Sequence, residues 1–268
     1  MKPKKSLGQH FLARGAVINR ILRALDCQPE DKVLEIGPGR GALTLPLLDQ
    51  VGTVLLVEKD GELAERLREK LGEKPVEILE GDFLELDWAE LESRLGRRFK
   101  ILSNLPYNVG TAIFTKLLRR AAPGTEMVLM FQREVGERLL AKPRGKEYGS
   151  LSVFAQLAAE GRLVTVVSPA AFQPPPKVES IVLRFRKRED PALPPEEWES
   201  FEAFVQAGFA QRRKMLRQNL RAVIPGALAE EVEARLSAVG ANAQARAEEL
   251  SVEQWIRLFK ARLETLGR

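Results

Sequence analysis

Residues 32–42 read Lys-Val-Leu-Glu-Ile-Gly-Pro-Gly-Arg-Gly-Ala, and this stretch decides the fold. The first five residues are mostly apolar and predict a buried strand, while the glycines that follow predict a sharp turn. Residues 42–48 then have helical character. A strand that enters a helix through a glycine-rich turn is typical of nucleotide-binding α/β sheets, because glycine lets a ligand approach the main chain closely.

Further apolar runs repeat this pattern along the chain. They predict strands over residues 53–57, 76–79, 99–102 and 126–131, with helices between them. Beyond residue 141 the pattern changes, and we expect a helix over 148–160 and a late pair of strands over 163–167 and 178–186. Residues 190–195 are rich in proline and form the clearest linker. The sequence after them is helical throughout.

Four polar or flexible positions follow consecutive predicted strands, namely Gly37, Glu58, Asp82 and Asn104. Because the carboxyl ends of parallel strands meet at one edge of a sheet, we expect these residues to line one ligand site. Glu58 lies roughly twenty residues past the first glycine, where a nucleotide fold places an acid on ribose hydroxyls. The glycine turn also fits an NAD-dependent dehydrogenase, which stays open here. Asp82 and Phe83 can hold the adenine of a cofactor, which favours S-adenosylmethionine over NAD.

The tetrapeptide Asn104-Leu105-Pro106-Tyr107 predicts chemistry on a flat ring that carries an exocyclic amino group. The Asn104 amide oxygen and the Leu105 carbonyl can accept both amino hydrogens of an adenine, while the Tyr107 ring stacks on the base. Accepting these hydrogens draws the nitrogen lone pair out of the ring, so that the nitrogen becomes a nucleophile. An ordinary strand-to-loop turn is the alternative interpretation.

Six stretches together resemble a known family, the ribosomal RNA adenine dimethyltransferases. They are residues 5–12, 37–42, 81–82, 104–108, 148–152 and 172–180. The resemblance runs through most of the chain and implies a class I methyltransferase that uses S-adenosylmethionine as its cofactor. The implied fold is α/β and Rossmann-like, with a seven-stranded mixed sheet whose final strand runs antiparallel, followed by a smaller all-α C-terminal domain.

The resemblance also assigns residues to the site. It adds His10 and Leu12 to the predicted cofactor residues, which from the glycine turn and the strand ends are Gly37, Gly39, Glu58, Asp82, Phe83 and Asn104. It places Asn104, Leu105, Pro106, Tyr107 and Phe172 at the target base, with Phe172 on the face of the flipped base opposite Tyr107. His10, the only histidine, stands where many members carry asparagine, and we assign it no role as a base.

The implied reaction is dimethylation of the exocyclic amino groups of two adjacent adenosines near the 3′ end of 16S rRNA, during small-subunit biogenesis. Leu105, Asn108 and the triple proline at 174–176 favour this bacterial enzyme. Two alternatives stay open: a methyltransferase of large-subunit rRNA, as in macrolide resistance, and a ribosome-assembly factor with little catalysis. No strong general base is needed, because a methyl group on a sulfonium is already activated.

Length and charge agree with an RNA partner. The 268 residues, 44% of them hydrophobic, suffice for two domains, and we expect a catalytic domain over 1–189 and a helical one over 196–268. The excess of 42 lysines and arginines over 37 acidic residues gives a net charge of +5, which suits a polyanion. With the single cysteine Cys27 and no apolar run long enough for a membrane, we expect a cytoplasmic protein that does not bind membranes. The sequence shows no metal-ligand cluster and no long apolar stripe, so we expect no metal site and a monomer.

The densest basic patch lies in the C-terminal part. We expect a helix over residues 198–223 with Leu216, Leu220 and Val223 facing inward. Arginines recur every fourth residue on this helix and predict phosphate contacts, together with two basic neighbours. The predicted RNA-binding set is Arg212, Arg213, Lys214, Arg217 and Arg221. Residues 251–254 have the spacing of a capping box and start a final helix that carries Trp255, Ile256, Phe259 and Leu263 inward.

Overall fold

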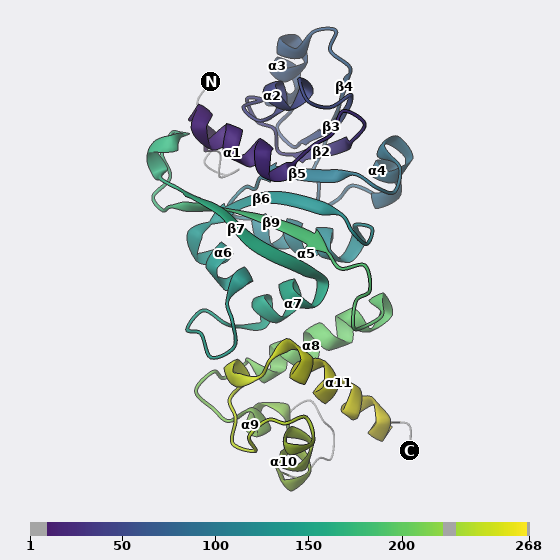
Figure 1. Ribbon diagram of the computed structural model, residues 1–268, viewed down its shortest axis with the longest axis vertical. Coiled ribbons are helices and arrows are strands. Elements are labelled where there is room, and N and C mark those ends of the chain that lie inside the picture. Colours follow the sequence, from purple (N-terminus) through teal and green to yellow (C-terminus); the bar gives the residue numbers. More distant parts are fainter. Residues whose placement is uncertain (1–9, 222–228, 267–268) are drawn as a thin grey trace. The chain divides into compact units, whose positions relative to one another are not determined.

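The computed structural model describes residues 10–221 and 229–266 and is shown in Figure 1. The chain divides into two compact units. We call the first the sheet unit, described over residues 10–136 and 159–189, and the second the helical unit, described over 137–158, 190–221 and 229–266. The second unit therefore takes residues 137–158 out of the span predicted for the first.

A seven-stranded sheet forms the centre of the sheet unit, in the order β4-β3-β2-β5-β6-β9-β7. The strands are β2 (Lys32–Ile36), β3 (Thr53–Glu58), β4 (Val76–Glu80), β5 (Lys100–Asn104), β6 (Glu126–Gln132), β7 (Ala159–Val167) and β9 (Ser180–Lys187). Strands β2 to β6 pair in parallel, whereas β9 is antiparallel to both β6 and β7. The predicted mixed sheet with an antiparallel final strand is confirmed. A separate antiparallel pair joins β1 (Phe11–Leu12) to β8 (Phe172–Gln173).

Helices cover both faces of the sheet because neighbouring strand residues point to opposite sides. The helices of the sheet unit are α1 (Gly15–Leu25), α2 (Thr44–Leu48), α3 (Gly61–Leu71), α4 (Trp88–Leu95) and α5 (Gly110–Arg120), while α6 (Arg133–Leu140) begins in the sheet unit and continues into the helical unit. On β6, Val128 packs in one buried cluster with Leu22 of α1. The ring of Phe131, three residues further along β6, meets Phe114 of α5 instead, with ring centroids 5.5 Å apart. This alternation places α1 and α5 on opposite faces of the sheet.

The helical unit has its own hydrophobic core. Its helices are α7 (Ser150–Ala158), α8 (Trp198–Gly208), α9 (Leu216–Leu220), α10 (Ala229–Ala238) and α11 (Val252–Leu266). Tyr148 and Val153 are buried in the same cluster as Phe201, Trp255 and Phe259. Because these side chains share one core, residues 137–158 belong with the C-terminal helices and not with the sheet.

The predicted helix over 198–223 is wrong as a single element. Helix α8 ends at Gly208, where an added Cβ would lie 2.4 Å from the Trp255 ring. The Asn219 amide then donates to the Gly208 carbonyl at 2.6 Å, which holds a reversal of the chain before the short helix α9. Leu216 and Leu220 are buried as predicted. Val223 lies outside the described residues.

Two smaller outcomes concern the edges of elements. Helix α7 ends at Ala158, and β7 begins at Ala159, earlier than the predicted strand over 163–167, because β9 pairs with it from Ala159 onward. The predicted capping box is confirmed: the main-chain N–H groups of Ser251 and Gln254 each donate to the other's side chain. Trp255, Ile256 and Phe259 face inward, while the side chain of Leu263 lies outside the described residues.

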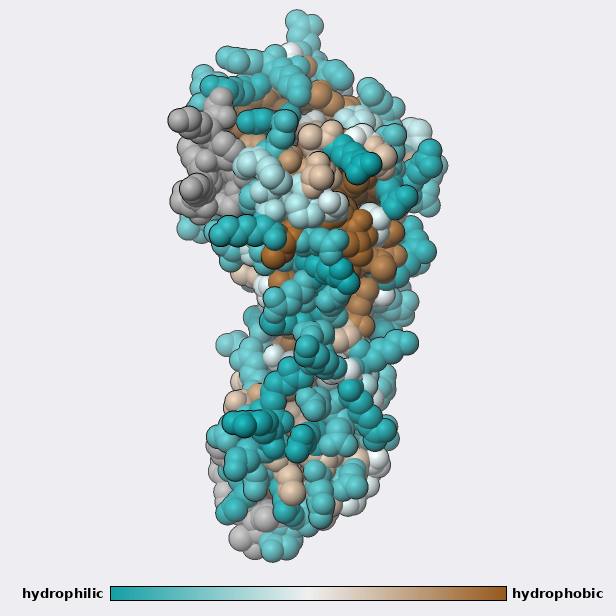
Figure 2. All heavy atoms as spheres, turned by 90° about the vertical axis from the view of Figure 1, so that its left-hand side faces the viewer, coloured by the Kyte–Doolittle hydropathy of each residue, from teal (hydrophilic) through white to brown (hydrophobic). Residues whose placement is uncertain are grey.

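Figure 2 shows one face of the molecule, on which hydrophilic residues dominate and hydrophobic ones gather mainly over the sheet unit. The large hydrophobic residues that are exposed in the described part of the chain are Leu163, Val166 and Val178. No helix among the described residues is long and apolar enough to cross a membrane.

Candidate active site

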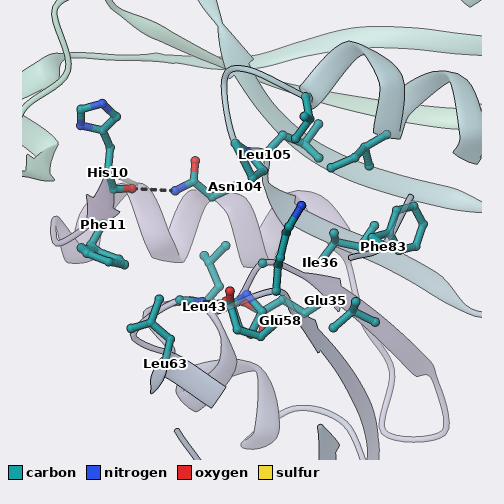
Figure 3. Close-up of a pocket in the computed structure, with 18 of the residues that line it drawn as sticks. His10, Phe11, Glu35, Ile36, Leu43, Glu58, Leu63, Phe83, Asn104 and Leu105 are labelled. Carbon is teal, nitrogen blue, oxygen red and sulfur yellow. Dashed lines mark hydrogen bonds between the residues drawn. The ribbon is translucent and has the colours of Figure 1, made fainter. Parts of the chain in front are cut away.

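The four predicted strand-end residues meet in one cleft. Gly37 follows β2, Glu58 ends β3, Asp82 follows β4, and Asn104 ends β5, and these strands are neighbours in the sheet. The cleft holds about 1120 Å³ of empty space, part of it open to solvent. Other predicted residues that line it are His10, Leu12, Gly39, Phe83, Leu105, Pro106 and Tyr107. Figure 3 shows side chains from several elements converging on it.

The glycine turn brings main-chain atoms to the cleft. Gly37 and Gly39 have φ angles of +65° and +57°, a region that a side chain makes costly. The Gly39 N–H donates to Glu58 at 3.0 Å, so the turn and the end of β3 are held together. A Cβ on Gly39 would lie 3.1 Å from the Phe11 ring, and the Arg40 guanidinium lies 4.2 Å from the centre of that ring. Phe11 and Arg40 therefore close one wall of the cleft.

Glu58 is a buried acceptor with both oxygens oriented. Its Oε2 accepts the Gly39 N–H and its Oε1 accepts the Asp60 N–H, each at 3.0 Å. Burial raises the pKa of the Glu58 carboxyl, and these main-chain bonds oppose the rise. Main-chain N–H groups hold the carboxylate in place where it lines the cleft, and this position suits a pair of sugar hydroxyls.

The loop after β4 is held by two lysines. Asp82 pairs with Lys59 at 2.6 Å and accepts the Leu84 N–H at 2.9 Å, and the bond from Lys59 lowers the pKa of the Asp82 carboxyl. From α5, the Lys116 ammonium donates to the carbonyls of Phe83, Leu84 and Leu86 at 2.8, 3.0 and 2.7 Å. The same ammonium lies 5.1 Å from the centre of the Phe83 ring. These contacts fix the aromatic and the carboxylate that face the cleft.

Asn104 contacts the segment before β1. Its Nδ2 donates to the His10 main-chain carbonyl at 3.1 Å, the dashed line in Figure 3. A carbonyl oxygen only accepts, so this bond fixes which end of the amide is which and leaves Oδ1 as the acceptor end. The His10 ring stacks on Tyr107 at 5.5 Å between centroids, and its Nδ1 lies 2.9 Å from the Pro174 carbonyl.

The prediction for Phe172 is not supported by the structure. Its side chain is 3% exposed, belongs to a core cluster with Ile21 and Val182, and does not line the cleft. In the β1–β8 pair, Phe172 lies opposite Leu12. Successive residues of an extended segment point to opposite sides, so Phe172 faces the core while Gln173 is exposed. Phe172 therefore anchors the loop, and the structure shows no second aromatic wall opposite Tyr107 formed by this residue.

Comparison with known proteins decides the family. The family described as "Ribosomal RNA adenine dimethylase" matches residues 1–263. This chain belongs to that family. Two similar proteins are each named "Ribosomal RNA small subunit methyltransferase A": one from Syntrophotalea carbinolica, 44% identical over 257 residues, and one from Thermosynechococcus vestitus, 40% identical over 264. In both cases the match covers 96% of this chain and 96% of the relative.

Solved structures agree with the adenine dimethylase fold. A dimethyladenosine transferase from Plasmodium falciparum has a TM-score of 0.78 and 23% identity, and the match covers 94% of this chain and 98% of that one. The 23S rRNA methyltransferase ErmE has a TM-score of 0.71 and 30% identity, over 95% of this chain and 99% of its own. Membership of a methyltransferase family rules out the dehydrogenase alternative, and ribosomal RNA is the substrate class.

The cofactor of this adenine dimethylase is S-adenosylmethionine, and the cleft fits it. Glu58 would hold the ribose hydroxyls with its oriented oxygens, while Asp82 and Phe83 would hold the adenine with a carboxylate and an aromatic ring. The glycine turn leaves room along Gly37, where a Cβ would meet nothing within 4 Å. The positively charged sulfonium supplies the activated methyl group.

Several residues of the adenine dimethylase cleft were missed by sequence reasoning. Glu35, the fourth residue of β2, lines the cleft at 2% exposure, and its Oε2 has no hydrogen-bond partner among the described residues. Burial raises the pKa of its carboxyl to about 8. Phe11 was detectable, since it stands between two predicted cofactor residues. No sequence pattern predicts the roles of Lys59 and Lys116, because these roles depend on how the loop after β4 folds.

The five predicted RNA-binding residues divide into two groups. Arg212 and Arg217 are engaged within the helical unit: Arg212 donates to the carbonyls of Lys146 and Tyr148 and pairs with Glu248, and Arg217 pairs with Glu233. The other three are exposed and form no ion pair with the described residues; they are Arg213, Lys214 and Arg221. Arg213 lies in the turn before α9, so the predicted single stripe of arginines is wrong.

Proposed function

We propose that this protein transfers methyl groups from S-adenosylmethionine to the exocyclic amino groups of two adjacent adenosines near the 3′ end of 16S rRNA, two to each base. The observation that carries the proposal is the oriented Asn104 amide at the end of β5, in the same cleft as the Glu58 carboxylate. Identity favours this substrate over large-subunit rRNA, since relatives named for the small subunit reach 44% and the 23S enzyme 30%.

The cleft activates the amino group by accepting its hydrogens. Asn104 Oδ1 and the Leu105 carbonyl take one hydrogen each, and this geometry turns the nitrogen lone pair away from the ring and toward the methyl group. Tyr107 stacks on the base and offsets part of the cost of taking it out of the RNA stack. The residues of the cleft therefore act mainly by holding the amino nitrogen of the adenine in line with the methyl group of the cofactor.

Proton loss needs no strong base in the cleft. After attack the nitrogen is cationic and strongly acidic, so water or a polar neighbour can take the proton. Burial raises the pKa of the Glu35 carboxyl, which favours its protonated form and makes it unsuited as that acceptor. For the second transfer the base already carries one methyl group, and one of the two amino hydrogen bonds is given up.

The helical unit is the RNA-docking part of this proposal. Arg213, Lys214 and Arg221 are exposed and unpaired among the described residues, which suits contacts with phosphates. We keep the predicted roles: the sheet unit is the catalytic part and the helical unit the RNA-docking part. Residues 137–158 move to the helical unit. We further propose that the protein acts as a monomer in the cytoplasm, on the small subunit or its precursor.

Transfer of labelled methyl from S-adenosylmethionine to purified ribosomal subunits that lack these modifications tests the proposal. Small and large subunits are offered separately, and the modified nucleosides are identified by mass spectrometry. We expect dimethyladenosine in small-subunit RNA only. Label confined to large-subunit RNA would move the activity to the other branch of the family. Subunit binding without label on either RNA would support an assembly factor with little catalysis.

A further inference from the structure

A hydrogen bond between two hydroxyl groups joins the cleft to the antiparallel part of the sheet. The Tyr107 hydroxyl lies 2.6 Å from Ser180 Oγ, although the residues are 73 positions apart in the chain. Tyr107 lines the cleft and is half-buried, whereas Ser180 is fully buried and does not line it. The hydroxyl end of the tyrosine thus points away from the cleft, toward β9.

Ser180 is a rigid anchor, and Tyr107 is not. Ser180 is the first residue of β9 and lies opposite Gln132 of β6 and Val167 of β7, so ladders on both sides hold its backbone. Tyr107 lies in the turn between β5 and α5, outside any ladder. A side chain on such a turn can adopt several rotamers unless a contact selects one. Two contacts orient this side chain: the His10 ring stacks on the Tyr107 ring, and the bond to Ser180 holds its hydroxyl end.

The same bond decides what the Tyr107 hydroxyl does. Burial raises the pKa of this hydroxyl above its ordinary value, so it remains protonated at neutral pH. Its close partner is a buried serine, and a proton acceptor for the reacting amino group would have to face the cleft instead. A base can therefore use the ring of Tyr107 and not its hydroxyl, on the ring face opposite the stacked His10.

We propose that Ser180 is a positioning residue, which holds the Tyr107 ring in the orientation that stacks on the target adenine. This inference rests on the proposed function, because the adenine is the base on which the ring stacks. The hydrogen bond selects the ring orientation before RNA binds, so binding costs less conformational entropy of the Tyr107 side chain. Losing it weakens productive RNA binding and leaves the S-adenosylmethionine site unchanged.

The first measurement is spectroscopic and independent of activity. The chain has two tyrosines, so the full-length protein with ¹³C only at the tyrosine carbon that bears the hydroxyl gives two signals, and Tyr107→Phe identifies the one from Tyr107. We expect Ser180→Ala to shift that signal and to leave the Tyr148 signal in place. An unshifted Tyr107 signal in folded Ser180→Ala would overturn the proposal, whatever substrate the enzyme proves to use.

The second measurement is kinetic. We expect Ser180→Ala to raise KM for the RNA roughly three- to tenfold, the range of one net hydrogen bond, with KM for S-adenosylmethionine unchanged. Tyr107→Phe removes the same bond from the other side and stays informative if Ser180→Ala folds poorly. The double variant should raise KM for the RNA no further than the single variant with the larger effect, because both substitutions remove the same hydrogen bond. Additive losses in the double variant would overturn the proposal.

Ser152→Ala is the matched control. Ser152 is also 0% exposed, and its hydroxyl donates at 2.6 Å to the Arg138 carbonyl inside the helical unit. Ser152→Ala should lower the stability of the protein as Ser180→Ala does, but it should leave the Tyr107 signal and the KM values for RNA and S-adenosylmethionine unchanged. The same KM change in Ser152→Ala would show a general packing effect and overturn the specific role of Ser180. If the small subunit proves not to be the substrate, the kinetic comparison is made on the RNA that is methylated.

Discussion

The side-chain amide of Asn104 donates to the main-chain carbonyl of His10 at 3.1 Å, across 94 positions of the chain. This contact gives the segment before β1 a role that its side chains do not reveal. It sets the orientation of the amide whose oxygen we propose as an acceptor for the target base. The contact uses the main-chain carbonyl of position 10, which a residue of any type supplies. The imidazole of His10 has separate contacts, with the Tyr107 ring and the Pro174 carbonyl.

We therefore expect His10→Asn to retain methyl transfer within about threefold of the wild type, because an asparagine keeps the main-chain carbonyl and can donate to Pro174 as well. Steady-state kinetics with S-adenosylmethionine and RNA check this. A loss of a hundredfold or more would show that the imidazole itself takes part in the reaction.

Glu35 is expected to make stability depend on pH. Burial raises the pKa of its carboxyl to about 8 in the folded chain, from an ordinary value of 4.5. Between these values unfolding releases a proton, so the free energy of unfolding falls as pH rises from about 4.5 to about 8, by at most roughly 5 kcal/mol. Glu35→Gln should flatten this dependence, as measured by urea unfolding at pH 5 and pH 8.

The control for that measurement is Glu65→Gln, an exposed glutamate on α3. It should keep the slope of the wild type. A wild-type stability that does not fall between pH 5 and pH 8 would mean that Glu35 is ionised in the folded state and has a partner that the structure does not show.

Lys116 is expected to act on cofactor affinity. Its ammonium holds three carbonyls of the loop that carries Phe83, and burial lowers its pKa. Lys116→Met should raise KM for S-adenosylmethionine about tenfold, the order expected for lost charge-assisted hydrogen bonds, with a smaller effect on KM for RNA. Lys74→Met, at an exposed lysine of the same unit, is the control. Equal KM values in the two variants would contradict this role.

The division of the basic residues predicts two kinds of defect. Arg213→Glu should weaken RNA binding and make its dependence on salt shallower by about one unit of the log–log slope, because one phosphate contact is lost. Lys260→Glu, an exposed lysine on α11, serves as the charge-matched control.

Arg212→Gln should instead lower the melting temperature, since it releases the carbonyls of Lys146 and Tyr148. If Arg212→Gln changed the salt dependence of RNA binding and left the melting temperature unchanged, Arg212 would be an RNA contact and not a structural residue.

Local signals were enough to predict the sheet and most of the cleft. The alternation of apolar runs with glycine-rich and acidic turns places Gly37, Glu58, Asp82 and Asn104 at successive strand ends, and parallel strands then bring them together without further information. The capping box at 251–254 is equally local and was equally predictable. Such features depend on residues close in sequence, whose physical preferences are largely independent of the rest of the fold.

The features that were missed depend on contacts between distant residues. Phe172 was assigned to the base by resemblance, yet its pairing with β1 turns it into the core. The helix over 198–223 looked continuous by periodicity, but Trp255 packing at Gly208 and the Asn219 cap end it. Ser180 and Tyr107 meet only because β9 returns beside β6.

The central claim is that the oriented Asn104 amide at the end of β5 activates the amino group for methyl transfer. The most direct test compares wild type with Asn104→Ala on unmodified small subunits, by mass spectrometry of the nucleosides, with RNA binding measured in parallel. We predict dimethyladenosine from the wild type and a loss of at least about a hundredfold in Asn104→Ala, the order found when one polar contact to a reacting centre is removed, with binding unchanged. Equal rates of methylation by the two proteins would contradict the account.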